Sequence, residues 1–82
     1  MTMKNPKRSL RLYDTVNVAG TRTAAVSCGL TLEKSNDIGD GVTEVALFGT
    51  VKQHEQFMKA EGYTDSDWRP DTLGSQGIYQ PR

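Results

Sequence analysis

The chain has 82 residues, a length that corresponds to one small domain. Ten basic and ten acidic residues cancel at pH 7, so the chain lacks the overall basic excess that is typical of nucleic-acid-binding proteins. A single cysteine excludes an internal disulfide and a cysteine-based zinc cluster, and no run approaches the ~20 apolar residues of a membrane helix. We therefore expect a soluble cytoplasmic protein with no membrane contact.

The charges are unevenly distributed along the chain. Residues 1–22 hold five basic residues and one acidic residue, a net charge of +4, and the remaining residues sum to −4. We expect residues 1–8 to form a basic N-terminal arm and residues 9–69 a single α+β domain. Residues 70–82 are poor in apolar side chains and are expected to be a C-terminal tail, or an added strand if they find a strand to pair with.

Two alternations of apolar and polar side chains predict the first two strands. Residues 9–18 alternate with one interruption near Asp14, which a β-bulge would explain. Residues 23–33 alternate in the same way, and Gly20 between the two runs suits a three-residue hairpin loop. The residues expected on the buried face of this hairpin are Leu10, Leu12, Val16, Val18, Val26, Cys28, Leu30 and Leu32.

The second half of the chain predicts a loop, a strand and a helix. Residues 35–41 hold turn-forming types at most positions and are expected to form an exposed loop. Residues 42–50 carry apolar side chains on both faces, which is typical of a central strand. Thr50 and Gln53 match a capping box at a helix start, and Gly62 suits a left-handed helix end. The core residues expected from this half are Val45, Leu47, Phe57 and Met58.

Together these elements predict an α+β fold with a three-stranded antiparallel sheet, one helix packed on one face, and a fourth strand if the tail pairs with the sheet. His54 falls on the apolar side of the predicted helix, where a histidine is usually a packed residue. Thr64 and Asp67 are suited to cap a further single turn that contains Trp68.

The residues needed for enzyme chemistry are sparse. Cys28 and His54 are the only cysteine and histidine, and an inward-facing thiol in apolar surroundings is unreactive. Asp37 and Asp40 lack the ligand spacing of a calcium loop, and residues 39–41 lack the lysine of a phosphate-binding loop. We therefore expect a non-enzymatic protein with no catalytic residue, no metal and no cofactor.

With enzyme chemistry disfavoured, we expect the chain to bind a larger protein or protein complex stoichiometrically. The small outward residues of the strand over 23–33 would let a partner strand approach if that strand lay at the sheet edge, and large apolar residues outside the core would anchor the partner. An inhibitor or adaptor would act in this way, such as the antagonists of host defence that phages and mobile elements encode. The candidate protein-binding residues are Ile38, Trp68, Tyr79, Ala25 and Ser27.

Two alternatives stay open at this point. A nucleic acid would contact the basic N-terminal residues and stack on an aromatic residue of the first strand. The candidate residues for this alternative are Lys4, Lys7, Arg8, Arg11 and Tyr13. The third possibility is a homodimer or larger homo-oligomer with a structural role.

Overall fold

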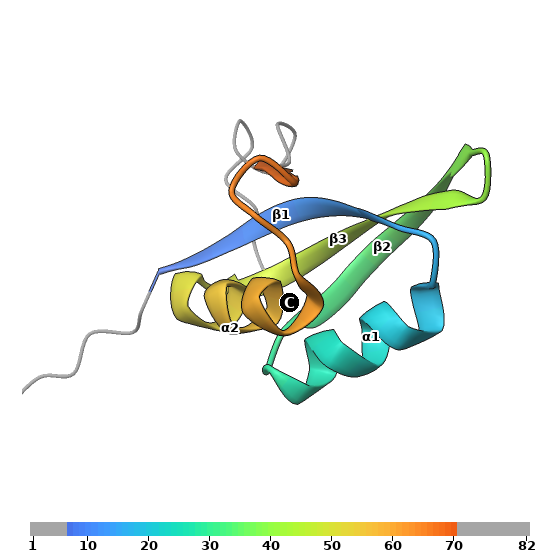
Figure 1. The fold of residues 1–82 in the computed structure, drawn as a ribbon. Coiled ribbons are helices and arrows are strands. Elements are labelled where there is room, and N and C mark those ends of the chain that lie inside the picture. Colours follow the sequence, from blue (N-terminus) through green and yellow to red (C-terminus); the bar gives the residue numbers. More distant parts are fainter. Residues whose placement is uncertain (1–6, 71–82) are drawn as a thin grey trace, which may run out of the picture.

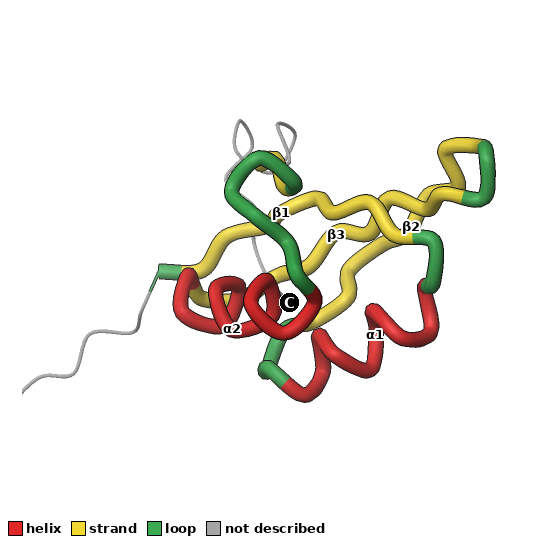
Figure 2. Tube along the Cα trace, in the orientation of Figure 1, coloured by secondary structure: helices red, strands yellow, loops and turns green. Residues whose placement is uncertain are grey.

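A computed structural model of the protein describes residues 7–70. Its elements follow in the order β1 (Arg8–Thr15), α1 (Val18–Ser27), β2 (Thr31–Gly39), β3 (Val42–Thr50), α2 (Val51–Glu61) and β4 (Trp68–Pro70). The strands form one sheet in the order β2-β3-β1-β4, and all neighbours are antiparallel. Both helices lie on the same side of this sheet (Figures 1 and 2). The predicted α+β class and antiparallel sheet are confirmed, and α1 is an additional helix.

The helix α1 occupies residues for which a hairpin was predicted. The side-chain oxygen of Asn17 caps its start by accepting a hydrogen bond from the amide of Gly20 at 3.0 Å. Gly20 therefore lies in the first turn of a helix rather than in a hairpin loop. The strand predicted over residues 23–33 is wrong, because most of that segment continues α1 and only its last residues enter β2.

The helix α1 ends ahead of Gly29, and only part of its apolar side chains is buried. Gly29 takes a φ of +84°, and the amide of Leu30 donates to the carbonyl of Ala25 at 2.9 Å, as in a Schellman motif. Ala25 is fully buried. Val26, which was predicted in the core, is 63% exposed. The apolar residues of α1 are small and spread around the helix, so they do not form the single stripe that usually reveals a helix.

The side chains of β1 face the opposite way from the prediction. β1 pairs with β3 in one continuous register, so the bulge predicted near Asp14 is wrong. Tyr13 is fully buried on the helix side, and Leu10, which was predicted in the core, is also buried but on the other face of the sheet. Val16, predicted in the core, follows β1 and is 81% exposed. The large aromatic ring of Tyr13, rather than the aliphatic residues, determines which face of β1 covers the core.

The loop predicted over residues 35–41 is mostly strand. β2 runs through Gly39, and only Asp40 and Gly41 connect it to β3; their φ angles are +57° and +75°. β3 spans residues 42–50 as predicted and lies between β2 and β1. This central position accounts for the apolar side chains on both of its faces.

The core lies between the sheet and the two helices. The Tyr13 ring packs on the rings of Phe57 and Tyr63, with centroids 5.0 and 5.2 Å apart. Of the other predicted core residues, Cys28 and Leu32 pack half-buried at the margin of the cluster, and Leu12 and Val18 are also half-buried. The buried residues of the cluster are Tyr13, Ala25, Leu30, Val45, Leu47, Phe57 and Met58.

The helix α2 begins and ends where the sequence predicted. The Thr50 hydroxyl oxygen accepts from the amide of Gln53 at 3.1 Å, and the Gln53 side chain accepts from the amide of Thr50 at 2.8 Å. At the other end Gly62 has a φ of +78°, and the amide of Tyr63 donates to the carbonyl of Met58 at 2.8 Å. The predicted capping box and glycine end are therefore confirmed.

A short strand follows α2. The Asp67 carboxylate accepts from the amide of Thr64 at 2.7 Å and closes a turn, after which β4 pairs with β1. Trp68 therefore starts a strand, so its predicted place within a helical turn is wrong. Residues 1–6 and 71–82 lie outside the described residues. Among residues 7–70, no helix is long and apolar enough to cross a membrane.

Replacing Asn17 tests whether α1 begins where the structure shows it. Asn17→Ala removes the side-chain acceptor for the Gly20 amide and should lower the free energy of unfolding by about 1 kcal/mol, whereas Asn17→Asp keeps an acceptor and should retain most of it. Urea unfolding measures both. The control Asn36→Ala, at an exposed position of β2, should change stability by less than about 0.5 kcal/mol. Equal effects of the two alanine variants would contradict the cap.

Candidate functional site

The only histidine connects α2 to β1 inside the core. His54 is fully buried; its Nδ1 lies 2.7 Å from the Tyr13 hydroxyl and its Nε2 lies 3.0 Å from the carbonyl oxygen of Ser9. A carbonyl oxygen only accepts, so Nε2 carries the proton and donates, and Nδ1 accepts from the Tyr13 hydroxyl. Both ring nitrogens therefore make hydrogen bonds that hold the fold, and neither is available to Cys28.

Burial controls the titration of both partners. It lowers the pKa of His54 to about 4, because the imidazolium form loses its hydration. The hydrogen bond that His54 donates to the Ser9 carbonyl acts in the opposite direction, and the positive charge of Arg11 lowers the pKa further. Burial likewise raises the pKa of Tyr13 to about 12. Both side chains are consequently neutral near pH 7, which is the state that their mutual hydrogen bond requires.

The first strand does not present the base-stacking surface that the nucleic-acid alternative needs. Arg11 and Tyr13 share one face of β1 as predicted, but both are buried on the helix side of the sheet. The guanidinium carbon of Arg11 lies 3.7 Å from the ring centroid of Trp68, a cation–π contact. Lys7 and Arg8 are exposed, and Lys4 lies outside the described residues.

The predicted protein-binding residues are scattered over the fold. Ala25 is fully buried and Ser27 is exposed, and both belong to α1, so the flat strip of small residues predicted on a strand is wrong. Trp68 is half-buried and packs against the core. Ile38 is 47% exposed near the end of β2, and Tyr79 lies outside the described residues. Among those that are described, Ile38 is the most exposed large apolar side chain.

β2 is the most extended exposed element of the described sheet. It pairs with β3 on one side and forms the outer edge on the other, and eight of its nine residues are exposed. The β2–β3 hairpin projects beyond the two helices (Figure 1). Register irregularities between Leu32 and Lys34 and between Asp37 and Gly39 flank a regular stretch. Register irregularities and charged residues at a sheet edge discourage pairing with arbitrary strands. A partner strand therefore has to be compatible with the irregular backbone and the charges of β2.

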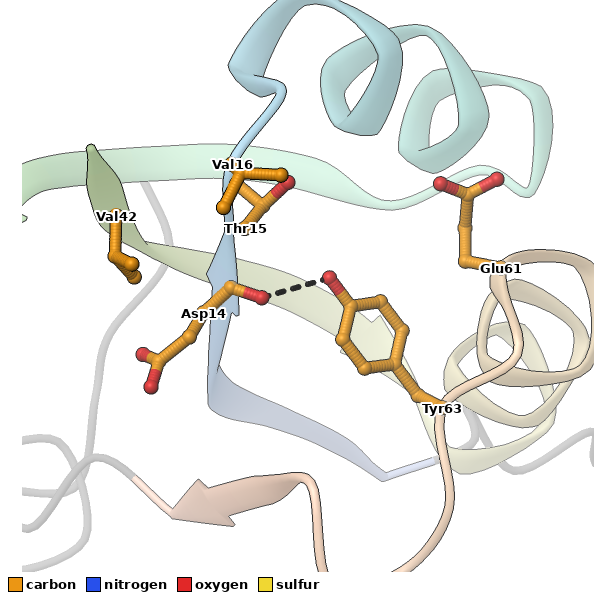
Figure 3. Close-up of a pocket in the computed structure, with 6 residues that line it drawn as sticks. All are labelled: Asp14, Thr15, Val16, Val42, Glu61 and Tyr63. Atoms are coloured by element: carbon orange, nitrogen blue, oxygen red, sulfur yellow. Dashed lines mark hydrogen bonds between the residues drawn. The ribbon is translucent and has the colours of Figure 1, made fainter. Parts of the chain in front are cut away.

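A recess of about 480 Å³ lies where β1 extends past β4. Figure 3 shows its lining, which comes from the end of β1, the start of β3 and the end of α2. The Tyr63 hydroxyl donates to the carbonyl of Asp14 at 2.9 Å. Burial raises the pKa of Tyr63, and the negative charges of Glu61 and Asp14 also raise it. The residues lining the recess are Asp14, Thr15, Val16, Val42, Glu61 and Tyr63.

The acidic side chains near this recess differ in their partners. Arg69 of β4 forms ion pairs with Asp14, at 3.1 Å, and with Glu44, on the face of the sheet away from the helices. Within residues 7–70, Glu61 has no ion-pair partner. In the same part of the chain, no group of three or more His, Cys, Asp or Glu side chains is arranged to hold a metal ion.

Comparisons with protein-family models, with curated proteins and with solved structures gave no match. Two surfaces of the described chain are open to a ligand or partner, the outer edge of β2 and the recess beside Tyr63. The edge was not predicted because the sequence analysis divided β2 between a strand and a loop, and the recess was not predicted because its lining comes from three elements. The one signal for the edge strand was Ile38, an apolar residue among polar ones.

The buried histidine makes stability depend on pH. The pKa of His54 is about 4 in the folded chain against an ordinary value of 6.5, so between these values the unfolded chain binds a proton that the folded chain excludes. The free energy of unfolding should therefore fall as the pH is lowered from about 6.5 to 4, by on the order of 3 kcal/mol in total. Urea unfolding at a series of pH values measures this slope.

The control for this slope is Tyr13→Phe/His54→Leu, which removes the histidine and the hydroxyl bonded to it; only the Ser9 carbonyl loses a partner, and that loss does not vary with pH. Its stability should change much less over the same range of pH. An equal slope in both proteins would assign the effect to carboxylates and contradict the role given to His54.

Proposed function

We propose that this chain is a small non-enzymatic protein-binding module that engages a larger protein partner by adding a partner strand to β2. The observation that carries this proposal is the exposed outer edge of β2, a strand of nine residues with one described neighbour. An edge strand offers a row of backbone donors and acceptors to an extended segment, and these hydrogen bonds supply much of the affinity in strand addition.

The residues along β2 support selective rather than general pairing. Main-chain hydrogen bonds are the same for any partner sequence, so side chains next to the edge decide which segment binds. Ile38 supplies a large exposed apolar group close to the hairpin turn, where few neighbours would obstruct a partner. Large apolar groups that become buried in an interface can contribute much of the binding energy. Ile38 is therefore the proposed anchor residue.

A module of this type would act by occupying a surface of its partner. Such action suits a stoichiometric inhibitor or an adaptor, including an antagonist of host defence of the kind that phages and mobile elements encode. Binding of this kind requires no catalytic group. Both ring nitrogens of His54 make hydrogen bonds within the core, which agrees with this proposal. The cytoplasm is the compartment we propose for it, since its one cysteine forms no internal disulfide.

Two matched variants test the proposal. Ile38 and Val51 are aliphatic residues with similar exposure, 47% and 48%, and they lie on different elements. Ile38→Asp should weaken binding to a partner captured from host lysate at least tenfold, which corresponds to about 1.4 kcal/mol, and Val51→Asp should leave the affinity unchanged. Both variants add the same charge, so the comparison isolates the position.

Capture should be carried out with and without nuclease, and affinities measured with the purified partner. A partner that survives nuclease and binds the Ile38→Asp variant tenfold more weakly supports strand addition at β2. Capture that is lost with nuclease would favour nucleic acid, and equal effects of the two variants would contradict the proposed surface.

A further inference from the structure

The recess beside Tyr63 combines apolar walls with one carboxylate, that of Glu61. Val16 is 81% exposed and Val42 is half-buried, so both valines offer apolar surface without a described covering element. The aromatic ring of Tyr63 forms another part of the lining, and Glu61 contributes a carboxylate, whereas the Asp14 side chain points away from Tyr63 (Figure 3). Among residues 7–70, no basic residue lines the recess.

We propose that this recess binds an arginine or lysine side chain of the protein partner. Either side chain has an apolar stem that packs against the valines and a cationic end that interacts with carboxylates and with an aromatic ring. The inference takes the existence of a protein partner from the proposed function, but it does not depend on strand addition to β2.

The charges around the recess support a cation as occupant. Asp14 and Glu44 pair with Arg69 on the face of the sheet away from the helices, so their charges are not directed into the recess. Glu61 supplies the negative charge on the Tyr63 side, because it has no ion-pair partner within residues 7–70. A cationic side chain would be attracted by this excess negative charge, and an acidic one would be repelled.

The walls of the recess are held in place before a ligand arrives. Tyr63 packs on Tyr13 and Phe57, with ring centroids 5.2 and 5.5 Å apart, and its hydroxyl donates to the carbonyl of Asp14. β4 pairs with β1 only over residues 11–13, so it stops before the recess. A preformed surface loses little conformational freedom on binding, which favours recognition of a single side chain.

Amide NMR titration of the whole chain tests the inference. The probes are the Nα-acetyl, N-methylamide derivatives of arginine and lysine, with those of norleucine and glutamate as uncharged and acidic controls. The cationic probes should shift the amide signals of residues 14–16, 42 and 61–63 in a saturable way, with a dissociation constant on the order of millimolar that rises with salt. The norleucine and glutamate derivatives should bind at least fivefold more weakly.

A matched pair of variants localises the effect. Glu61→Gln removes a carboxylate from the recess and should weaken binding of the cationic probes at least threefold. Glu55→Gln makes the same change at an exposed position of α2 outside the recess and should leave binding unchanged.

Three results would overturn the inference: equal binding of the norleucine derivative, an equal effect of the two variants, or no saturable shift. The Ile38→Asp comparison reports separately on the proposed function. If the Ile38→Asp variant loses partner binding but no cationic probe binds, the inference about an arginine or lysine side chain is wrong and strand addition to β2 is still supported.

Discussion

The hydrogen bonds of His54 determine where α2 lies on the sheet. One imidazole contacts the Tyr13 side chain and the Ser9 main chain of β1, and both contacts are made in the buried interior. A shift of α2 along β1 would leave these groups without partners, and each unsatisfied buried group costs about 1–3 kcal/mol. The position of α2 in turn places its glycine end, and hence Tyr63, against Asp14. The recess is thus a consequence of the buried pair.

The order of the strands determines which surfaces are left for binding. β3 and β1 occupy the middle of the sheet, and β4 covers the outer side of β1 over three residues only. β2 has nine residues and no described strand on its outer side. The two proposed contact surfaces therefore differ in position and chemistry. The outer edge of β2 offers backbone hydrogen bonds, and the recess, lined by the end of β1, the start of β3 and the end of α2, offers apolar surface and the carboxylate of Glu61.

The parts of the fold that the sequence predicts are those with strong local signals. Thr50, Gln53 and Gly62 specify α2 without help from the rest of the chain, and the apolar run of β3 marks a central strand. α1 was missed because its small residues alternate by chance, although Asn17 and Gly29 carry the usual signals of a helix start and end. The recess could not be predicted, since its lining comes from three elements brought together only by tertiary packing.

Hydrogen exchange of the chain alone and in complex with its captured partner tests the central claim most directly. Strand addition requires that the outward amides of β2 become hydrogen-bonded, and such amides exchange slowly. The account predicts that protection in residues 31–39 rises strongly in the complex, while protection in α1 and the exposed face of α2 changes little. Unchanged exchange throughout β2, with new protection confined to the helices, would contradict it.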